Sequence, residues 1–269
     1  PTSLHGTAYA QFVEQTSIRR RMLASANEMA RLAYDQEKDI RTILDEVEKS
    51  VFGLSASRVR HDLEPVNEVV SDYYDYVDEQ SKRDEEISGV PTGLTDLDRV
   101  LGGMQKSDLL IIAGRPGSGK TGFLLSVAKT AAQKYKKNVA IFSLEMSNQQ
   151  LVQRLIAQET GIDTHRLRTG KLRDEEWDVF TKAIDVLSAT HIWLDDTPAI
   201  TPLAMRTKCR RLANEHTLDL ILVDYLQLMG SDSRSENRVQ EVSYISRSLK
   251  VLARELQVPV LAAAQLSRA

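Results

Sequence analysis

The sequence predicts an α/β protein in which a parallel β-sheet is flanked by helices and preceded by a helical segment. Two observations support this fold class. From Thr92 onward, short apolar runs rich in β-branched residues alternate with amphipathic helical patterns, as in a parallel sheet covered on both faces. Before that point, apolar residues recur at the spacing of a helix. The chain therefore has a helical first part and a strand–helix second part.

Residues 1–53 are expected to form a helical hairpin. One amphipathic helix is predicted from Tyr9 to Tyr34 and a second from Asp39 to Phe52, because apolar residues recur about once or twice per turn in each. The polar link AYDQEKD between them is typical of an antiparallel pair. Since a hairpin alone buries little apolar surface, its apolar faces are expected to meet partner helices.

Residues 54–91 are expected to be a linker that contains one more helix. This helix is predicted at about 65–80, where Pro65 suits a helix start and valines and tyrosines follow at helical spacing. The residues alone leave two interpretations open. The helix either packs on its own domain or is an arm that docks on a neighbouring subunit.

Five strands are expected in the strand–helix part, which covers residues 92–269. They are Leu109–Ala113, Val139–Leu144, Ile192–Leu194, Leu220–Val223 and Val258–Ala264. Amphipathic helices are predicted between them, most clearly from Val239 to Leu256.

The composition is that of a soluble globular protein, with 42% hydrophobic and 27% charged residues. A net charge of -3 gives no overall attraction to nucleic acid. Cys209 is the only cysteine, which excludes disulfides and favours a reducing compartment. No apolar run reaches the roughly 20 residues that span a bilayer. We therefore expect a cytoplasmic protein with no membrane partner.

A glycine-rich stretch follows the first predicted strand. Gly114 to Thr121 matches G-x-x-x-x-G-K-[ST] between a strand and a helix, which is the context that a phosphate-binding loop requires. Glycines let the backbone turn its N–H groups inward around a phosphate. Lys120 then reaches the β- and γ-phosphates of a nucleotide, and Thr121 offers a hydroxyl to Mg²⁺. The alternative is a glycine-rich turn with an incidental lysine. The predicted phosphate-binding residues are Gly114, Arg115, Pro116, Gly117, Ser118, Gly119, Lys120, Thr121 and Gly122.

Three polar residues follow other predicted strands, and parallel strands end at one edge of a sheet where ligands bind. Asp224 is the candidate second ligand of Mg²⁺, acting directly or through water. Glu145 is the candidate base that activates water, and Gln265 is a candidate sensor of the γ-phosphate. The alternatives are a turn residue for Asp224, a solvated residue beside a helix cap for Glu145, and a solvated strand end for Gln265.

These segments resemble the bacterial replicative DNA helicase family, the DnaB type. The segments that carry the resemblance are TGLTDLDRVLGGMQKSDLLIIAGRPGSGKT, IFSLEMS, LRTGKL, IWLDDTP, LILVDYLQLM, ENRVQEVSYISRSLKVLARELQVPV and AQLSR. The match is nearly continuous from Thr92 to Arg268. The hairpin and the linker helix resemble the end of the family's N-terminal domain and its linker helix, which favours the docking arm for residues 65–80.

The resemblance implies a RecA-like ATPase domain in a ring-shaped homohexamer that uses ATP and Mg²⁺. It implies 5′-to-3′ translocation on single-stranded DNA, duplex separation at a replication fork, and primase and a helicase loader as partners. Residues 1–53 would then be the C-terminal part of an N-terminal collar. By resemblance, Lys120 and Thr121 hold phosphate and metal, Glu145 is the base, Asp224 is the second metal carboxylate and Gln265 is the γ-phosphate sensor.

Compared with the family, the chain is expected to lack segments at its ends. The chain starts with Pro1 and stops at Ala269, so both ends are expected to be cut and residues 92–269 to be an ATPase domain that is incomplete at its C-terminus. The family's main DNA loop and arginine finger follow AQLSR. Because an arginine finger contributes on the order of 10³-fold or more, this fragment is expected to hydrolyse ATP poorly and not to unwind DNA.

Two basic segments bear on DNA contact. The loop SDSRSENR, residues 231–238, carries Arg234 and Arg238, and loops at that position face the channel of a ring; the alternative is an ordinary solvated loop. A second group before Asp224 is expected to be a solvated helix face and comprises Arg206, Lys208, Arg210 and Arg211.

Three rival functions remain for comparison. A recombinase or clock-type ATPase shares the phosphate loop and the Asp224 strand, but the long helicase-like runs and the helical N-terminus disfavour it. A non-catalytic module that only builds a ring or recruits primase predicts no effect of Lys120→Ala. A metabolic kinase is disfavoured because no arginine-rich lid is evident. The absence of an N-K-x-D motif mildly favours adenine over guanine.

Overall fold

In the computed structural model, the described residues are 6–35, 38–40, 42–43, 46–47, 50, 65–82, 87–230 and 238–266. The chain divides into two compact units, residues 1–79 and residues 80–269. Within the described residues, no helix is both long and apolar enough to cross a membrane.

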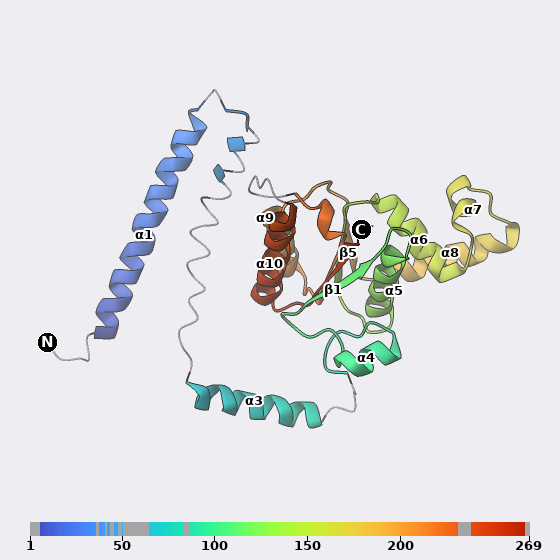
Figure 1. Ribbon diagram of the computed structural model, residues 1–269, viewed down its shortest axis with the longest axis horizontal. Helices are drawn as coiled ribbons and strands as arrows, with labels where there is room; N and C mark the ends of the chain where they lie inside the picture. The colour runs from blue at the N-terminus through green and yellow to red at the C-terminus, as the bar shows by residue number, and fades with distance from the viewer. Residues whose placement is uncertain are drawn as a thin grey trace. The chain divides into compact units, whose positions relative to one another are not determined.

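The first unit contains helix α1, Gly6–Ala33, and most of helix α3, Val66–Ser81 (Figure 1). Leu32 near the end of α1 and Ile43 are buried in this unit. Most of the second predicted helix, Asp39 to Phe52, lies outside the described residues, so the hairpin stays a prediction. Both α1 and α3 expose large apolar side chains.

The second unit alternates strands with helices, as predicted. Its strands are β1 (Leu109–Gly114), β2 (Val139–Ser143), β3 (Ile192–Asp195), β4 (Leu220–Asp224) and β5 (Val260–Gln265). Its helices are α4 (Thr95–Leu101), α5 (Lys120–Gln133), α6 (Asn148–Thr160), α7 (Thr164–Thr169), α8 (Asp174–Ser188), α9 (Pro202–Glu215), the short 3₁₀ helix η2 (Leu226–Leu228) and α10 (Arg238–Leu256).

The five strands form one sheet in the order β1-β5-β4-β2-β3, and every pair is parallel. The predicted α/β class with a parallel sheet is therefore confirmed. The last strand begins at Val260 and not at Val258, because the N–H of Val258 still bonds to Ala253 at the end of α10. Parallel pairing brings all five carboxyl ends to one edge, which we call the carboxyl rim.

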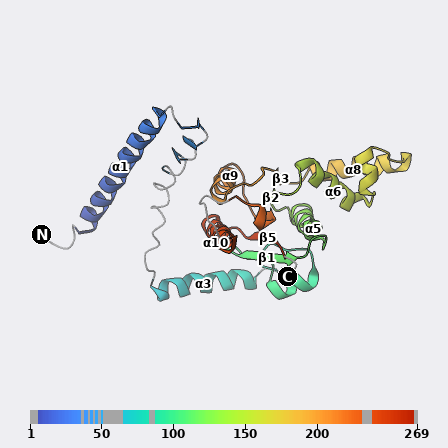
Figure 2. The same ribbon diagram turned by 45° about the horizontal axis from the view of Figure 1, so that its top comes forward.

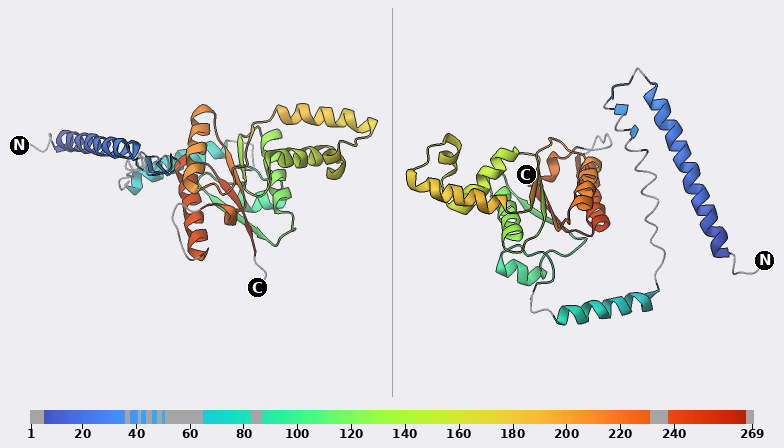
Figure 3. Two further views of the ribbon diagram at one scale, coloured as in Figure 1. Left: turned by 90° about the horizontal axis from the view of Figure 1, so that it is seen from above. Right: turned by 180° about the vertical axis from the view of Figure 1, so that it is seen from behind.

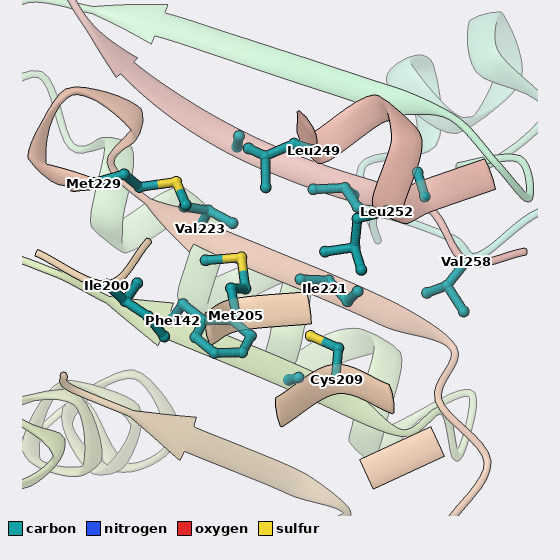
Figure 4. Close-up of a cluster of buried hydrophobic side chains, with 14 of the residues drawn as sticks. Phe142, Ile200, Met205, Cys209, Ile221, Val223, Met229, Leu249, Leu252 and Val258 are labelled. Carbon is teal, nitrogen blue, oxygen red and sulfur yellow. The ribbon is translucent and has the colours of Figure 1, made fainter. Parts of the chain in front are cut away.

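Each face of the sheet has its own core, because successive strand residues point to opposite faces. On β4, Ile221 and Val223 pack with α9 and α10 in a cluster that includes Met205 and Leu249 (Figure 4). The alternate residues of β4 pack with α5 and α6 on the other face. Figure 2 shows α9 and α10 on one side of the sheet and α5 on the other. All five residues of β2 and of β4 are buried, as expected for central strands.

Capping side chains set where the helices at the carboxyl rim begin. Ser147 caps α6 in a capping box with Gln150, and Thr201 caps α9 with Pro202 as its first residue. Helices α6 and α8 pack side by side and extend beyond the sheet (Figure 3). The loops after β2 and β3, which lead into α6 and α9, lie at the carboxyl rim because the parallel strands end there.

Candidate active site

The phosphate loop connects β1 to α5 and depends on two glycines with positive φ. Gly117 has φ 75° and Gly119 has φ 89°, and an added Cβ would meet nothing within 4 Å at either position. Glycine is therefore needed there for its backbone conformation and not for space. At Gly114 the reason is different, since a Cβ would lie 2.5 Å from the Ser118 hydroxyl. At Gly122 an added Cβ would also meet nothing within 4 Å.

The loop leaves the N-terminus of α5 open to a ligand. Gly119 is the N-cap residue and no side chain caps the helix, so the first N–H groups of α5 lack a side-chain partner. Residues 115–119 are exposed. A helix N-terminus of this kind attracts anions because its N–H groups and the helix dipole point the same way.

Lys120, the first residue of α5, lies over the loop. Its ammonium group donates to the carbonyl oxygens of Gly114 and Arg115, both at 3.1 Å. An ammonium group has three donors, so one remains for a phosphate oxygen at this position. The lysine is thus held over the loop, beside the uncapped start of α5.

Thr121 joins the phosphate loop to β4. Its hydroxyl donates to Oδ2 of Asp224 at 2.6 Å, across 103 residues of sequence. Asp224 is only 2% exposed, and its Oδ1 atom has no hydrogen-bond partner in the described part of the chain. A buried carboxylate oxygen without a partner costs free energy unless a cation or water meets it.

This arrangement fits a magnesium ion. Mg²⁺ is typically bound by one or two protein oxygens together with phosphate oxygens and water. Thr121 and Asp224 supply that number of oxygens, and among the described residues no group of three His, Cys, Asp or Glu side chains gathers into a metal site of its own. An ion held here would therefore depend on a phosphate ligand.

Glu145 lies two residues beyond the end of β2, at the carboxyl rim. Ser143 is paired with Asp224 in the sheet, and the N–H of Leu144 bonds to the Asp224 carbonyl oxygen at 2.8 Å. The side chain of Glu145 is exposed, and its carboxylate has no hydrogen bond or ion pair within the described ranges. It is therefore accessible to a water molecule or a ligand.

Gln265 ends β5, which lies between β1 and β4. Gly114 is its partner in the sheet, so the backbones of the phosphate loop and of Gln265 are neighbours. The side chain of Gln227 holds the backbone of Gln265 at two points: it accepts from Gln265 N at 3.1 Å and donates to Gln265 O at 3.0 Å. Gln227 was not among the residues predicted from the sequence. Its polar side chain in the apolar run LQLM was the only available signal.

The basic residues of the loop before α10 and of α9 differ in their contacts. Arg234 lies outside the described residues. Arg238 begins α10, where its guanidinium donates to the Gln227 carbonyl oxygen and to Glu241. Two arginines of the α9 cluster pair with Glu255 of α10, and Lys208 pairs with Asp195. The expectation of a merely solvated α9 face was therefore wrong, because much of that charge joins α9 to its neighbours.

The sequence matches a known family over most of its length. A family model for the DnaB-like helicase C terminal domain matches residues 89–269. The replicative DNA helicase DnaB of Geobacillus stearothermophilus is 47% identical over 269 residues, and the replicative DNA helicase DnaC of Bacillus subtilis (strain 168) is 44% identical over 269 residues. Each match covers 100% of this chain and 59% of the relative. The chain thus spans little more than half the length of these relatives.

Solved structures agree with this assignment. A structure described as an ATPase domain superposes with a TM-score of 0.72 at 31% identity, covering 77% of this chain and 73% of that one. A DnaB-like replicative helicase, described with its interactions with primase, superposes with a TM-score of 0.77 at 26% identity, covering 99% of this chain and 61% of that one. Since the family model covers most of the sequence and the fold agrees with it, the chain belongs to the DnaB-like replicative helicase family and contains its RecA-like C-terminal domain.

Proposed function

We propose that this chain is the ATP-hydrolysing part of a replicative DNA helicase subunit. In this proposal, hydrolysis of ATP with Mg²⁺ drives 5′-to-3′ translocation on single-stranded DNA and separates the duplex at a replication fork. The observation that carries the proposal is the 2.6 Å hydrogen bond between Thr121 and Asp224 beside the phosphate loop. It joins the two protein oxygens that a nucleotide-bound magnesium ion needs.

Each rim residue has one task in hydrolysis. The loop N–H groups and Lys120 would bind the β- and γ-phosphates, while Thr121 and Asp224 would hold the metal. When bound, Mg²⁺ offsets the negative charge that develops on the phosphates. Glu145 takes a proton from the attacking water as the water oxygen bonds the γ-phosphorus and the bond to ADP breaks. The Gln265 side chain senses the γ-phosphate.

The hydrolysis proposal is tested by variants of the full-length protein. We expect Lys120→Ala to abolish ATP hydrolysis and unwinding of a forked duplex, and Glu145→Gln to abolish hydrolysis while nucleotide still binds. Lys129→Ala is the matched control, because Lys129 lies on the same helix α5 and pairs with Glu159 away from the loop. Unchanged hydrolysis in Lys120→Ala would favour a non-catalytic module, and strand exchange without unwinding would favour a recombinase.

The proposal extends to assembly into a homohexameric ring. Residues 1–53 serve as part of its collar, residues 54–91 as linker, and residues 92–269 as the ATPase domain. Primase and a helicase loader are the proposed partners, and for primase the support is a related helicase that was described together with it. Helix α3 acts as the docking arm, since it exposes Val66 at 77% and Tyr74 at 72%, which would be costly without a partner.

The docking arm is tested by changing one face of α3. Val70 is 59% exposed on its apolar face, so Val70→Asp should place a charge in the subunit interface and shift the ring to smaller species. Ser71→Asp is the matched control, because it adds the same charge away from the valines. The measurement is the mass distribution at equal protein concentration. Equal distributions for both variants would contradict the docking role.

Arg234 and Arg238 are proposed contacts to the DNA backbone. Arg238 also bonds to Gln227 and Glu241, so Arg238→Ala would loosen the start of α10 as well as remove a DNA contact. Arg234→Ala is therefore the cleaner test. It should weaken binding to single strands of any sequence and lower the salt dependence by about one counterion. An unchanged salt dependence would remove Arg234 from the proposal.

A further inference from the structure

The backbone around Glu145 is held by a series of hydrogen bonds. We call residues 144–147 the base loop. Its first N–H, of Leu144, bonds to the Asp224 carbonyl oxygen at 2.8 Å. The buried Ser143 hydroxyl accepts from Met146 N at 3.1 Å and donates to Met146 O at 2.8 Å. The last N–H of the loop, of Ser147, bonds to the Gln150 side chain at 3.0 Å.

The far end of the base loop is fixed by a residue from another strand. Asp196, just after β3, accepts from Asn148 N at 2.9 Å through Oδ2 and from Asn148 Nδ2 at 3.2 Å through Oδ1. Asn148 is the first residue of α6, so its N–H has no partner within the helix. A carboxylate at this helix end is also favoured by the helix dipole. Asp196 thus ties the loop after β2 to the loop after β3, across 48 residues of sequence.

The loop that carries Asp196 is itself anchored. The carboxylate of Asp195 accepts from Thr197 N at 2.9 Å and from Lys208 Nζ at 2.5 Å, and the same ammonium donates to the Thr197 hydroxyl at 2.8 Å. Lys208 belongs to α9, and Asp195 is paired with Phe142 of β2. Asp196 therefore projects from a turn that is fixed to both the sheet and a helix.

The carboxylate of Glu145 has no such support of its own. Its side chain is exposed and forms no hydrogen bond or ion pair in the described part of the chain. Its position before a ligand binds is therefore set by the backbone on either side of it. Displacing a reacting group by about 1 Å costs up to roughly 100-fold in rate.

We propose that Asp196 is a positioning residue for ATP hydrolysis, which fixes the start of α6 and thereby the base loop that carries Glu145. This inference rests on the proposed role of Glu145 as base. Asp196 touches neither the phosphate loop nor Asp224 in the hydrogen bonds described above, so its effect reaches the reaction only through the base loop. Its loss should therefore lower the rate of hydrolysis without weakening nucleotide binding.

The test compares variants of the full-length protein by ATP hydrolysis and by affinity for a fluorescent ATP analogue with Mg²⁺. Asp196→Ala is expected to lower kcat on the order of 10-fold to 100-fold while KM and analogue affinity stay within about twofold. Asp196→Asn keeps an oxygen that can accept from Asn148 N, so it should give an intermediate kcat. Asp163→Ala is the matched control: Asp163 caps α7 by accepting from His165 N at 2.7 Å and should leave kcat unchanged.

The outcomes separate this inference from the proposed function. If Glu145→Gln hydrolyses ATP at the wild-type rate, the proposed base is wrong, whatever Asp196 does. If Glu145→Gln is inactive but Asp196→Ala has the wild-type kcat, only the positioning role is overturned. Should Asp196→Ala fail to fold, a wild-type kcat in Asp196→Asn would overturn it as well.

Discussion

Replacing Asp224 by asparagine should stabilise the ligand-free protein while disabling it. The side chain of Asp224 is buried and accepts one hydrogen bond, from Thr121, while its Oδ1 atom has no partner among the described residues. In the ligand-free protein the carboxylate is thus poorly compensated. Asparagine keeps an oxygen for Thr121 and removes the uncompensated charge.

The size of the effect follows from the unpartnered atom. A buried polar atom without a partner costs about 1–3 kcal/mol. The new amide nitrogen also lacks an acceptor and keeps this cost of a neutral atom, so only the additional cost of the buried charge is recovered, about 1–2 kcal/mol. In a unit of the size of residues 80–269, each kcal/mol changes Tm by about 2–4 °C. Asp224→Asn should therefore raise Tm by about 2–8 °C in the absence of ligand.

Thermal unfolding followed by circular dichroism measures this in two conditions. In EDTA without nucleotide the variant should unfold at the higher temperature. With Mg²⁺ and a non-hydrolysable ATP analogue at about 100 times its Kd, the wild type should gain about 2.7 kcal/mol, and the order should reverse. Asp219→Asn is the control, because Asp219 accepts from Asn138 N at 2.8 Å and should not be stabilised by the change. An Asp224→Asn protein that unfolds earlier than the wild type in EDTA would refute the reasoning.

Three further predictions concern stability and reactivity. Asp98 is buried and accepts three hydrogen bonds from the turn before α4, so Asp98→Ala should lower the free energy of unfolding in urea by about 2–4 kcal/mol. Asp96 on the same helix is 92% exposed at its side chain, so the control Asp96→Ala should lower it by less than about 0.5 kcal/mol. Burial alone would raise the pKa of Asp195, but hydrogen bonds from Lys208 and Thr197 outweigh it and hold the pKa below its ordinary value. The stability that the Asp195–Lys208 pair contributes is therefore present above about pH 3.9 and is lost as pH falls through the lower pKa of the folded protein. The Tm difference between wild type and Lys208→Met should shrink in that pH range. A constant difference would contradict the pairing. Burial and the charge of Asp195 raise the pKa of Cys209 to about 12, so iodoacetamide should modify it at about pH 8 only after unfolding, as read by mass spectrometry.

The sheet and the phosphate loop could be predicted from the sequence because their signals are local. Four apolar residues in a row, as in Leu220 to Val223, indicate a strand buried on both faces. The glycines at 117 and 119 are needed for a backbone conformation that other residues rarely adopt. Since parallel strands share a carboxyl edge, the motif and the strand ends together predicted that Asp224 and Glu145 would lie at the same rim as Lys120.

The support of that rim could not be predicted, because it depends on contacts between distant residues. Gln227 holds the backbone of Gln265 across 38 residues, and Asp196 holds Asn148 across 48 residues. No motif links the two members of either pair, and Gln227, Asp196 and Asn148 taken alone are ordinary polar residues near a strand end or a helix start. Glu255 on α10 likewise turns an apparently solvated basic face of α9 into a helix contact. Such pairs can be identified only from the three-dimensional positions of the strands and helices that carry them.

Because the candidate site residues all lie at the carboxyl rim, the opposite edge of the sheet has only a structural role. At the amino ends of the strands, Asn138 and Asp219 only tie one loop to another, and Asn138 also bonds to Thr217. A displacement of about an ångström at the amino ends would change the stability of the domain but not the geometry of the candidate site. Substitutions and loop insertions should therefore be tolerated at the amino ends of the strands, where the contacts only stabilise the fold. They should be tolerated less at the carboxyl rim, where the positions of the side chains matter.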